Sequence, residues 1–262
     1  MTQRPTLDDQ RTTINVLLYG DNGTCKTPSS ACAARLGRVA FIDLERGLQR
    51  AALEPHGVPV ANIEVIRETS HEGLVDVIRQ IASELARDPE AFTAVVLDSV
   101  SELQRCLLEE TAPGRDRPAQ GDYQAITQQT RRICRGLRDL PVHAIFTAHV
   151  RRDEDADGEV HLGPALTPTA ANDLLGLVDL AGYMRAAPRA GQDEPEYVSA
   201  FRPGRKFIAK DRFGLLPPRL VHPTFDRILS YVDSTYSIAE PDPEQAAYMA
   251  RVHKPVKPTT TT

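Results

Sequence analysis

The stretch Gly20-Asp21-Asn22-Gly23-Thr24-Cys25-Lys26-Thr27 decides the fold. It follows the apolar run 14–19 and precedes the small, Ala-rich run 27–36, so we expect it to join a strand to a helix. Backbone N–H groups of such a loop, together with the N-terminus of the helix, bind phosphate groups. Lys26 adds a positive charge, and the Thr27 hydroxyl is a ligand for Mg²⁺. The stretch therefore predicts a phosphate-binding loop (P-loop) for a nucleotide such as ATP.

Two residues depart from the usual pattern G-x-x-x-x-G-K-[ST]. Cys25 stands where the pattern has its second Gly, at a point where phosphate and backbone approach closely and a Cβ is hard to accommodate. Pro28 removes one N–H that would reach the α-phosphate, although Pro is tolerated in the first turn of a helix. We therefore expect the fold to survive and the nucleotide affinity to be reduced. A Cys at a helix N-terminus beside a Lys is also expected to have a lowered pKa.

Apolar runs alternate with helical patterns on both sides of this loop. The runs are short and nearly continuous, as strands covered on both faces are, and they span 14–19, 38–43, 62–66, 93–98, 142–148 and 177–184. Helical patterns span 27–36, 71–87 and 121–140. This alternation predicts an α/β fold with a mostly parallel central sheet. The runs 197–202, 205–210 and 227–232 are expected to add antiparallel strands to it.

Length and composition fit a globular protein with one large α/β domain or two small ones. The chain has 262 residues, and we place the core at 13–232, with a flexible arm at 1–12 and a Pro- and Thr-rich, disordered tail at 233–262. The net charge of −5 excludes a strongly basic surface over the whole chain, but not DNA binding through local loops. The four cysteines lack zinc-site spacing and are expected to be reduced. No signal peptide and no apolar run of ~20 residues is evident, which predicts a cytoplasmic protein without a membrane partner.

Acidic residues end two of the expected strands. Asp43 and Glu45 close the run 38–43, and Asp98 closes the run 93–98. Because the carboxyl ends of parallel strands converge on the nucleotide, Asp98 is expected to hold Mg²⁺ as a Walker B residue does. Glu45 would then orient or deprotonate the attacking water. The alternative is that Asp43 and Asp98 cap the helices that follow them.

Five blocks in one order resemble the RecA-like recombinase superfamily. They are 20–27, 41–45 (Phe-Ile-Asp-Leu-Glu), 94–99, 146–149 (Phe-Thr-Ala-His) and 210–214 (Lys-Asp-Arg-Phe-Gly). The chain looks most similar to compact phage-encoded RecA-like ATPases associated with single-strand annealing, over about residues 13–232. The resemblance implies a RecA-like P-loop NTPase core, ATP and Mg²⁺ as cofactors, and single-stranded DNA as a partner. It also implies the host cytoplasm as the location if a phage encodes the protein.

The resemblance implies roles for single residues as well. Glu45 matches the catalytic glutamate and Asp98 the Walker B aspartate of the family. His149 stands where the family has a polar sensor of the γ-phosphate, usually Gln, and a His can also titrate. Lys210 and Arg212 match a basic pair that reaches the nucleotide of the neighbouring subunit in a homo-oligomer. Without the resemblance, that pair would be interpreted as a solvated pair on an edge strand.

Two stretches without periodicity are candidate DNA-binding loops. The stretch 111–122 carries Arg115 and Arg117 among Pro and Gly, and the stretch 150–170 carries Arg151 and Arg152. In the family that the chain resembles, the matching loops hold single-stranded DNA, and mobile loops that order on binding suit that role. The second stretch has no aromatic residue for base stacking, and its acidic residues would repel phosphates: Asp153, Glu154, Asp155, Asp157 and Glu159.

These features predict an ATP-dependent protein that assembles head-to-tail and acts on single-stranded DNA in recombination or annealing. A single-strand binding protein is a further expected partner. Two alternatives stay open. A degenerate P-loop protein, weakened by Cys25 and Pro28, would have a structural or adaptor role. A P-loop ATPase of another branch would lack annealing activity, and the acidic second loop without stacking residues favours that alternative.

Overall fold

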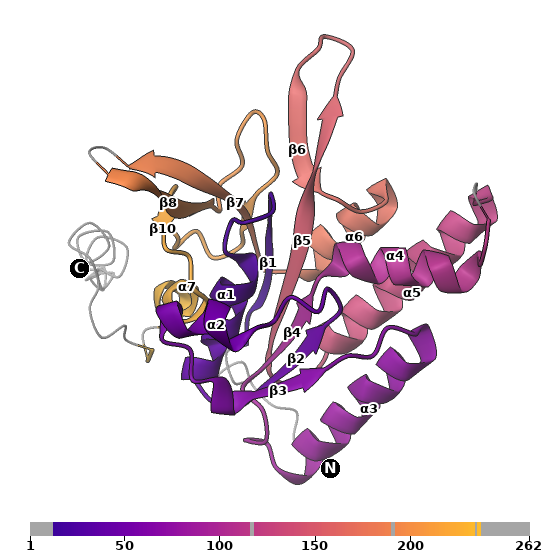
Figure 1. Cartoon of the computed structure of the whole chain (residues 1–262), viewed down its shortest axis with the longest axis horizontal. Coiled ribbons are helices and arrows are strands. Elements are labelled where there is room, and N and C mark those ends of the chain that lie inside the picture. The colour runs from indigo at the N-terminus through magenta and orange to yellow at the C-terminus, as the bar shows by residue number, and fades with distance from the viewer. Residues whose placement is uncertain (1–12, 116–117, 190–191, 234, 237–262) are drawn as a thin grey trace, which may run out of the picture.

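The computed structural model describes residues 13–115, 118–189, 192–233 and 235–236 (Figure 1). The expected arm at 1–12 and most of the expected tail lie outside these ranges. Within them, parallel strands form the centre of the molecule in the order β7-β1-β5-β4-β2-β3. Their bounds are β1 Asn15–Gly20, β2 Val39–Asp43, β3 Ile63–Ile66, β4 Ala94–Asp98, β5 His143–Glu154 and β7 Leu180–Arg189.

Antiparallel strands extend this sheet at two places. On one side, β8 (Gln192–Ala200) and β9 (Lys210–Asp211) pair with β7, and β10 (Leu220–Val221) pairs with β8. At the far end of β5, β6 (Val160–Pro164) pairs antiparallel with it. The described residues thus confirm the α/β fold with a mostly parallel central sheet and an antiparallel extension.

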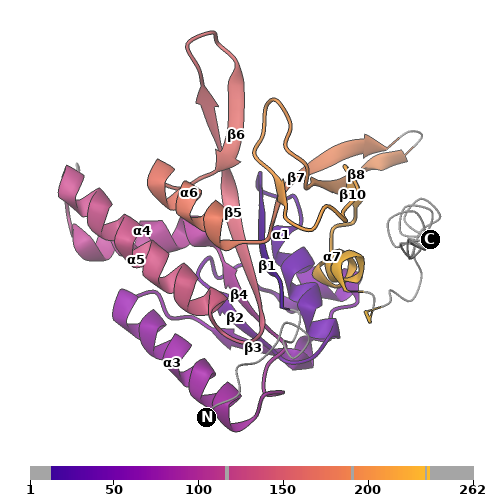
Figure 2. The same ribbon diagram turned by 180° about the vertical axis from the view of Figure 1, so that it is seen from behind.

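Helices cover both faces of the sheet, as Figures 1 and 2 show from opposite sides. The strands have two apolar faces: in β1, Leu17 and Tyr19 enter one core cluster, and Val16 and Leu18 enter the other. The first cluster is closed by α3 (His71–Arg87), α4 (Val100–Thr111), α5 (Gln120–Arg138) and α6 (Pro168–Leu177). The second is closed by α1 (Lys26–Ala31), α2 (Arg50–Leu53), α7 (Phe225–Val232) and short 3-10 turns at Cys32–Arg35 and Val60–Asn62, while a further 3-10 turn at Glu54–His56 buries no residue.

Three expected segments have a different structure. The run 227–232 is not a strand but lies in α7, because Phe225, Ile228 and Leu229 recur at helical spacing and bury one face in the second core cluster. The run 205–210 reaches the sheet only in β9. The stretch 150–170 is not an irregular loop: it forms the end of β5, the turn at Gly158, then β6 and the start of α6.

The β5–β6 hairpin projects beyond the sheet (Figure 1). It is held at its base by Tyr19, whose hydroxyl contacts the carbonyl oxygens of Leu162 and Ile208. The segment 206–208 also runs beside β6, since Leu162 N–H donates to Lys206 O over 2.7 Å and Ile208 N–H donates to Leu162 O over 3.1 Å. The hairpin is therefore fixed both to β1 and to the segment that follows β8.

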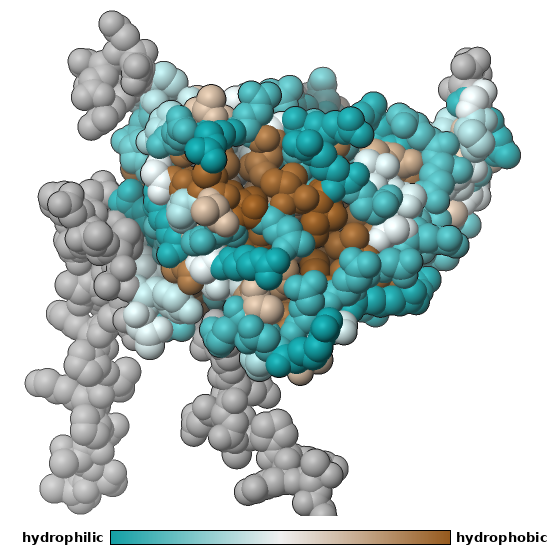
Figure 3. Space-filling model, turned by 60° about the horizontal axis from the view of Figure 1, so that its bottom comes forward, coloured by the Kyte–Doolittle hydropathy of each residue, from teal (hydrophilic) through white to brown (hydrophobic). Residues whose placement is uncertain are grey.

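Apolar residues reach the surface at the underside of the molecule. Figure 3 shows them gathered in the middle of this face, between hydrophilic margins. Within the described ranges, the large apolar side chains that are exposed lie far apart in the sequence: Val65, Tyr123, Val160 and Ile208. Among the described residues, no helix combines the length and the apolarity that crossing a membrane requires.

Candidate nucleotide site

The P-loop lies between β1 and α1, as the sequence predicts. Gly20 ends β1 beside β7, where a Cβ would lie 2.2 Å from the carbonyl oxygen of Met184, so only glycine fits. Gly23 has a φ of +74°, and Thr24 Oγ1 donates to Asp21 O over 2.8 Å, which closes the turn. Lys26 is the first residue of α1. The loop thus directs its backbone and the start of α1 to one place at the carboxyl end of the sheet.

Cys25 has a left-handed backbone, with φ 63° and ψ 26°. This conformation favours glycine. It is therefore a second reason, besides the close approach of phosphate, why the usual pattern has Gly at this position. Burial raises the pKa of the Cys25 thiol, and this outweighs the lowering by the Tyr197 hydrogen bond and the Lys26 charge. The expectation of a lowered thiol pKa is therefore wrong, because the side chain is half-buried.

Replacing Cys25 with Gly is expected to stabilise the protein and to raise its affinity for ATP. The left-handed backbone costs an L-residue about 1–2 kcal/mol, and the change also removes a Cβ from the loop. Thermal unfolding and calorimetric ATP titration measure the two effects. The control is Cys25→Ala, which removes the thiol but keeps the Cβ and should gain neither. Equal or weaker ATP binding by Cys25→Gly would mean that the loop is adapted to Cys25.

The Lys26 ammonium is buried within the loop. Its Nζ donates to Gly20 O over 3.1 Å and to Asp21 O over 2.8 Å. Burial lowers the pKa of Lys26, against the opposing charges of Glu45, Asp98 and Asp21. A compact ammonium fixed among the loop carbonyls fits the phosphate-binding role that the sequence predicts for it.

Thr27 and Asp98 form a hydroxyl–carboxylate pair beside Lys26. Thr27 Oγ1 donates to Asp98 Oδ2 over 2.6 Å, and Thr147 Oγ1 donates to the other carboxylate oxygen. Burial raises the pKa of Asp98, and the two hydroxyl hydrogen bonds oppose that rise. Hydroxyl and carboxylate oxygens are the hard ligands that Mg²⁺ prefers, so Thr27 and Asp98 fit the predicted metal site.

The capping alternative is wrong for Asp98. The N-cap of α4 is Ser99, whose Oγ accepts from the backbone N–H of Glu102 over 3.2 Å. Asp43 does not cap a helix either: its Oδ1 accepts from Gly47 N–H over 3.0 Å and its Oδ2 lies 3.5 Å from Arg67 Nε. Asp43 therefore holds the turn after β2, and Asp98 is left to face Thr27.

Glu45 is held by two polar side chains. His149 Nε2 lies 2.9 Å from Glu45 Oε1, and the Ser99 hydroxyl donates to the same oxygen. Register explains the approach of His149, because β5 pairs with β1 so that His149 stands opposite Gly20. The hydrogen bond from His149 lowers the pKa of Glu45, and the same bond raises the pKa of His149. The structure thus brings the predicted base and the predicted sensor together.

The pKa of His149 is expected to fall toward its ordinary value of 6.5 in a Glu45→Gln variant. Because the folded-state pKa of His149 is raised, the pair stabilises the fold below the ordinary imidazole pKa and loses that contribution as pH rises through the raised value. The lowered pKa of Glu45 means that its share is lost only as pH falls through that lowered value. NMR titration of the imidazole measures the shift, with His149→Gln to identify its signal. An unchanged His149 pKa in Glu45→Gln would contradict the pairing.

Lys210 and Arg212 lie away from the P-loop of their own chain. Lys210 Nζ donates to the carbonyl oxygens of Leu175 and Val178 at the end of α6, each over 2.7 Å. Arg212 Nη1 lies 2.5 Å from Asp179 Oδ1. Strand β9 pairs with the first residues of β7, whereas the P-loop leaves the sheet beside Met184. The pair is thus at the amino-terminal edge of the parallel strands.

Of the two candidate DNA-binding segments, only the second has a contact with the P-loop among the described residues. In 111–122, Arg115 Nη1 lies 3.0 Å from Asp122, and Arg117 lies outside the described residues. In the hairpin, Arg152 Nη2 lies 2.8 Å from both carboxylate oxygens of Asp21 in the P-loop. The hairpin is therefore in direct contact with the phosphate-binding loop.

Two site residues escaped the sequence interpretation, Thr147 and Ser99. Both lie inside blocks that the sequence singles out, within two residues of a residue with an assigned role, and that proximity is the signal that could have found them. Thr147 lies two residues before His149, and Ser99 follows Asp98. Their partners depend on how neighbouring strands align, which no local pattern shows.

Comparison with known families matches this geometry. Residues 12–213 match a family described as the AAA domain, and no curated protein matches the chain. The matched range spans more than half of the chain and includes the P-loop, Glu45, Asp98 and His149. The sheet, the strand–loop–helix unit and the carboxylates at the carboxyl ends of β2 and β4 agree with a nucleotide-binding domain of this kind. The chain therefore belongs to the AAA domain family and has a P-loop domain of the ATPase type.

Proposed function

We propose that this protein binds and hydrolyses ATP with Mg²⁺ and uses that cycle on single-stranded DNA, in recombination or annealing. The observation that carries the proposal is the meeting of three parts at one place. The Thr27–Asp98 pair, the Glu45–His149 pair and the base of the β5–β6 hairpin all adjoin the P-loop.

Each residue of the site has a distinct task in this proposal. Lys26 and the loop N–H groups bind the phosphates, and Thr27 with Asp98 would hold Mg²⁺. Bound Mg²⁺ neutralises charge that develops on the transferred phosphoryl group. Glu45, kept ionised by its lowered pKa, accepts the proton of the attacking water. His149 hydrogen-bonds to Glu45 through its imidazole ring. In this proposal it senses the γ-phosphate, and because Glu45 is the general base, a change at His149 acts directly on catalysis.

The acidic side chains of the hairpin repel DNA phosphates less than their number indicates, because several of them are paired. Asp153 is paired with Arg151, Asp155 with His161 and Glu159 with Lys206, at distances of 2.7, 2.8 and 3.1 Å. The ion pairs with Arg151 and Lys206 reduce the repulsion that Asp153 and Glu159 would exert on phosphates. The contacts support a role for the hairpin in binding DNA.

Arg152 connects the hairpin to the nucleotide site, because its guanidinium contacts Asp21 of the P-loop. Its pair with Asp21 is exposed, and exposed ion pairs contribute little to stability because water screens them. A phosphate near the hairpin can therefore draw Arg152 away at little cost and change the charge around the P-loop. This route supports coupling between DNA binding and hydrolysis.

A head-to-tail homo-oligomer gives Lys210 and Arg212 a role in hydrolysis. In such an assembly the amino-terminal edge of one sheet meets the P-loop edge of the next, and this pair lies at that amino-terminal edge. The pair would then act on the neighbour's nucleotide as an arginine finger does, with an effect of about 10³–10⁵ on turnover.

Mixing two inactive variants tests this assembly. Lys210→Ala keeps the P-loop and Lys26→Ala keeps the basic pair, so the mixture should regain ATPase activity at shared interfaces. Circular dichroism must first show that Lys210→Ala is folded, because the carbonyl oxygens of Leu175 and Val178 lose their donor in this variant. If mixed oligomers form and activity does not return, the role in trans is wrong.

One measurement tests the proposed function as a whole: the ATPase rate with and without single-stranded DNA. We expect hydrolysis that depends on Mg²⁺ and rises when DNA is added. Hydrolysis without any response to DNA would favour an ATPase of another branch. Absence of both binding and hydrolysis would favour the second candidate, a degenerate P-loop protein with an adaptor role, which the left-handed Cys25 supports.

A further inference from the structure

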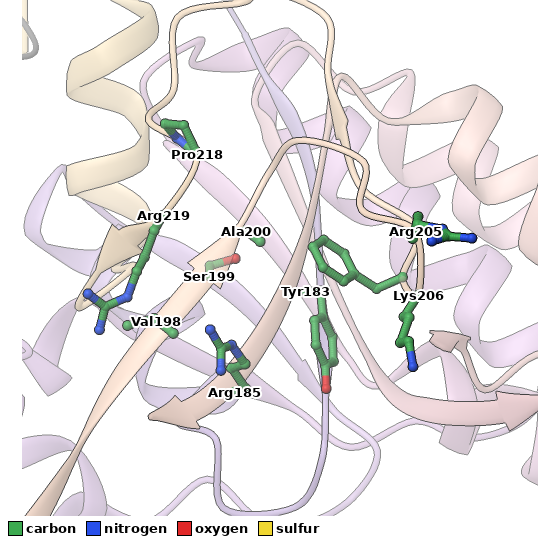
Figure 4. Close-up of a pocket in the computed structure, with 10 residues that line it drawn as sticks. Tyr183, Arg185, Val198, Ser199, Ala200, Arg205, Lys206, Pro218 and Arg219 are labelled. Atoms are coloured by element: carbon green, nitrogen blue, oxygen red, sulfur yellow. The ribbon is translucent and has the colours of Figure 1, made fainter. Parts of the chain in front are cut away.

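A groove with aromatic and cationic walls lies between β8 and the chain segment 203–219. It encloses about 470 Å³, and its floor is the strand β8 around the buried Val198 (Figure 4). None of its lining residues belongs to the P-loop or to the Thr27–Asp98 and Glu45–His149 pairs. The groove thus shares no lining residue with the proposed nucleotide site, although its Tyr183 lies near enough to Asp21 of the P-loop to interact with its charge. Its volume is in the range of pockets for small ligands, about 300–1,000 Å³.

Aromatic rings form one wall of the groove. The ring centroids of Tyr183 and Phe207 are 5.3 Å apart with an interplanar angle of 31°, and Tyr183 in turn lies 5.4 Å from Tyr19. Phe207 belongs to the segment whose backbone is hydrogen-bonded to Leu162 of the hairpin. This aromatic wall is therefore preassembled and attached to the hairpin, which has no aromatic residue of its own.

Cations line the groove, and none of the lining residues that the structure describes is acidic. Figure 4 shows Arg219 on one side, Arg205 and Lys206 on the other, and Arg185 between them. Lys206 is paired with Glu159, and Arg219 with Glu196. Within the described part of the chain, the side chains of Arg185 and Arg205 have neither an ion pair nor a hydrogen bond, and both residues are exposed. Free guanidinium groups beside aromatic rings suit a ligand with phosphates and flat bases.

We propose that this groove binds a segment of single-stranded nucleic acid, with a base against Phe207 and Tyr183 and phosphates against Arg185 and Arg205. The inference rests on the proposed function, whose DNA partner it places at a second site beside the hairpin. Stacking on an aromatic side chain accepts every base, so binding here is independent of sequence. The groove supplies the stacking surface that the hairpin lacks.

The phosphate contacts are tested with a fluorescent oligothymidylate and the double variant Arg185→Ala/Arg205→Ala. The slope of log K against log salt should decrease by about 1.4, since each phosphate contact with a single strand contributes about 0.7. The matched control is Arg79→Ala/Arg87→Ala, which removes the same charge from exposed positions on α3 and should leave the slope unchanged.

The stacking contact is tested with Phe207→Leu, which keeps an apolar side chain but removes the ring. Oligonucleotide affinity should fall by about 5- to 100-fold, the range for loss of one stacked base. The variant Phe207→Tyr keeps a ring at this position, and its oligonucleotide affinity should stay close to wild type. Both groove variants should keep the wild-type ATP affinity and the ATPase rate measured without DNA.

Four outcomes would overturn the inference. If the wild type binds DNA and the groove variants bind it equally well, the groove is not a nucleic-acid site, but the proposed function stands. If the wild type binds no single-stranded DNA, the inference and the proposed partner fail together. Loss of ATP affinity in the groove variants would assign the groove to the nucleotide. Competition by polyglutamate as strong as that by an oligonucleotide of equal charge would assign it to an acidic peptide.

Discussion

Glu45→Gln is expected to lower the ATP hydrolysis rate by about 10²–10⁴-fold while ATP affinity stays close to wild type, the loss typical of a removed general base. The change keeps the size of the side chain and its ability to accept from Ser99 and His149. It removes only the negative charge that can take a proton. Single-turnover hydrolysis and equilibrium ATP binding, measured on the same preparation, separate the two effects.

Glu54→Gln is the matched control for this variant. Glu54 is an exposed carboxylate in the segment that follows β2, and its neutralisation should leave hydrolysis unchanged. A Glu45→Gln protein that hydrolyses ATP at the parent rate would reduce Glu45 to a surface residue. It would also show that the His149–Glu45 pair has no role in catalysis.

Lys26→Ala is expected to weaken ATP binding by at least about a hundredfold, because each hydrogen bond from a charged donor is worth about 1.5–3 kcal/mol. The Lys26 ammonium is buried at the loop and makes two hydrogen bonds to its carbonyls, so it is already directed at the phosphate-binding turn. The fold should survive, since the lost bonds are replaced by water at the carboxyl end of the sheet. Fluorescent-ATP titration and circular dichroism give the two readings.

Lys26→Arg distinguishes charge from shape at the same position. Arg keeps the positive charge but spreads it over a planar fork that does not match the compact space between Gly20 and Asp21. We expect only partial recovery of binding. A folded Lys26→Ala protein with unchanged ATP affinity would remove the nucleotide site from this loop.

The P-loop and the parallel sheet were predictable from the sequence because their signals are local. A short apolar strand, a Gly-rich turn and Lys26-Thr27 occur within fourteen consecutive residues, 14–27. The same holds for Asp98, which ends the buried strand β4, and for Glu45, which lies two residues after the end of the buried strand β2. Residues joined by non-local contacts were not predictable: Thr147 reaches Asp98 only because β4 and β5 align as they do.

The carboxyl-terminal part was harder to predict for a related reason. The run 227–232 contains enough β-branched and aromatic residues to suit a strand, and its helical spacing appears only when Phe225 is included. The hairpin was missed because Asp157-Gly158, a turn signal, stands among charges that suggested a loop. The aromatic wall beside it joins Tyr183 and Phe207 across different elements.

The length of β5 has a mechanical consequence. One unbroken strand runs from His143 to Glu154, so Thr147, His149 and Arg152 all belong to the same rigid element. Its pairing with β1 and β4 clamps the inner end, and the hairpin forms the free outer end. His149 is the last residue of β5 that pairs with β1, so it stands at the boundary between the clamped and the projecting parts of this strand. We therefore expect a displacement of the hairpin to be felt first at His149, beside the carboxylate of Glu45.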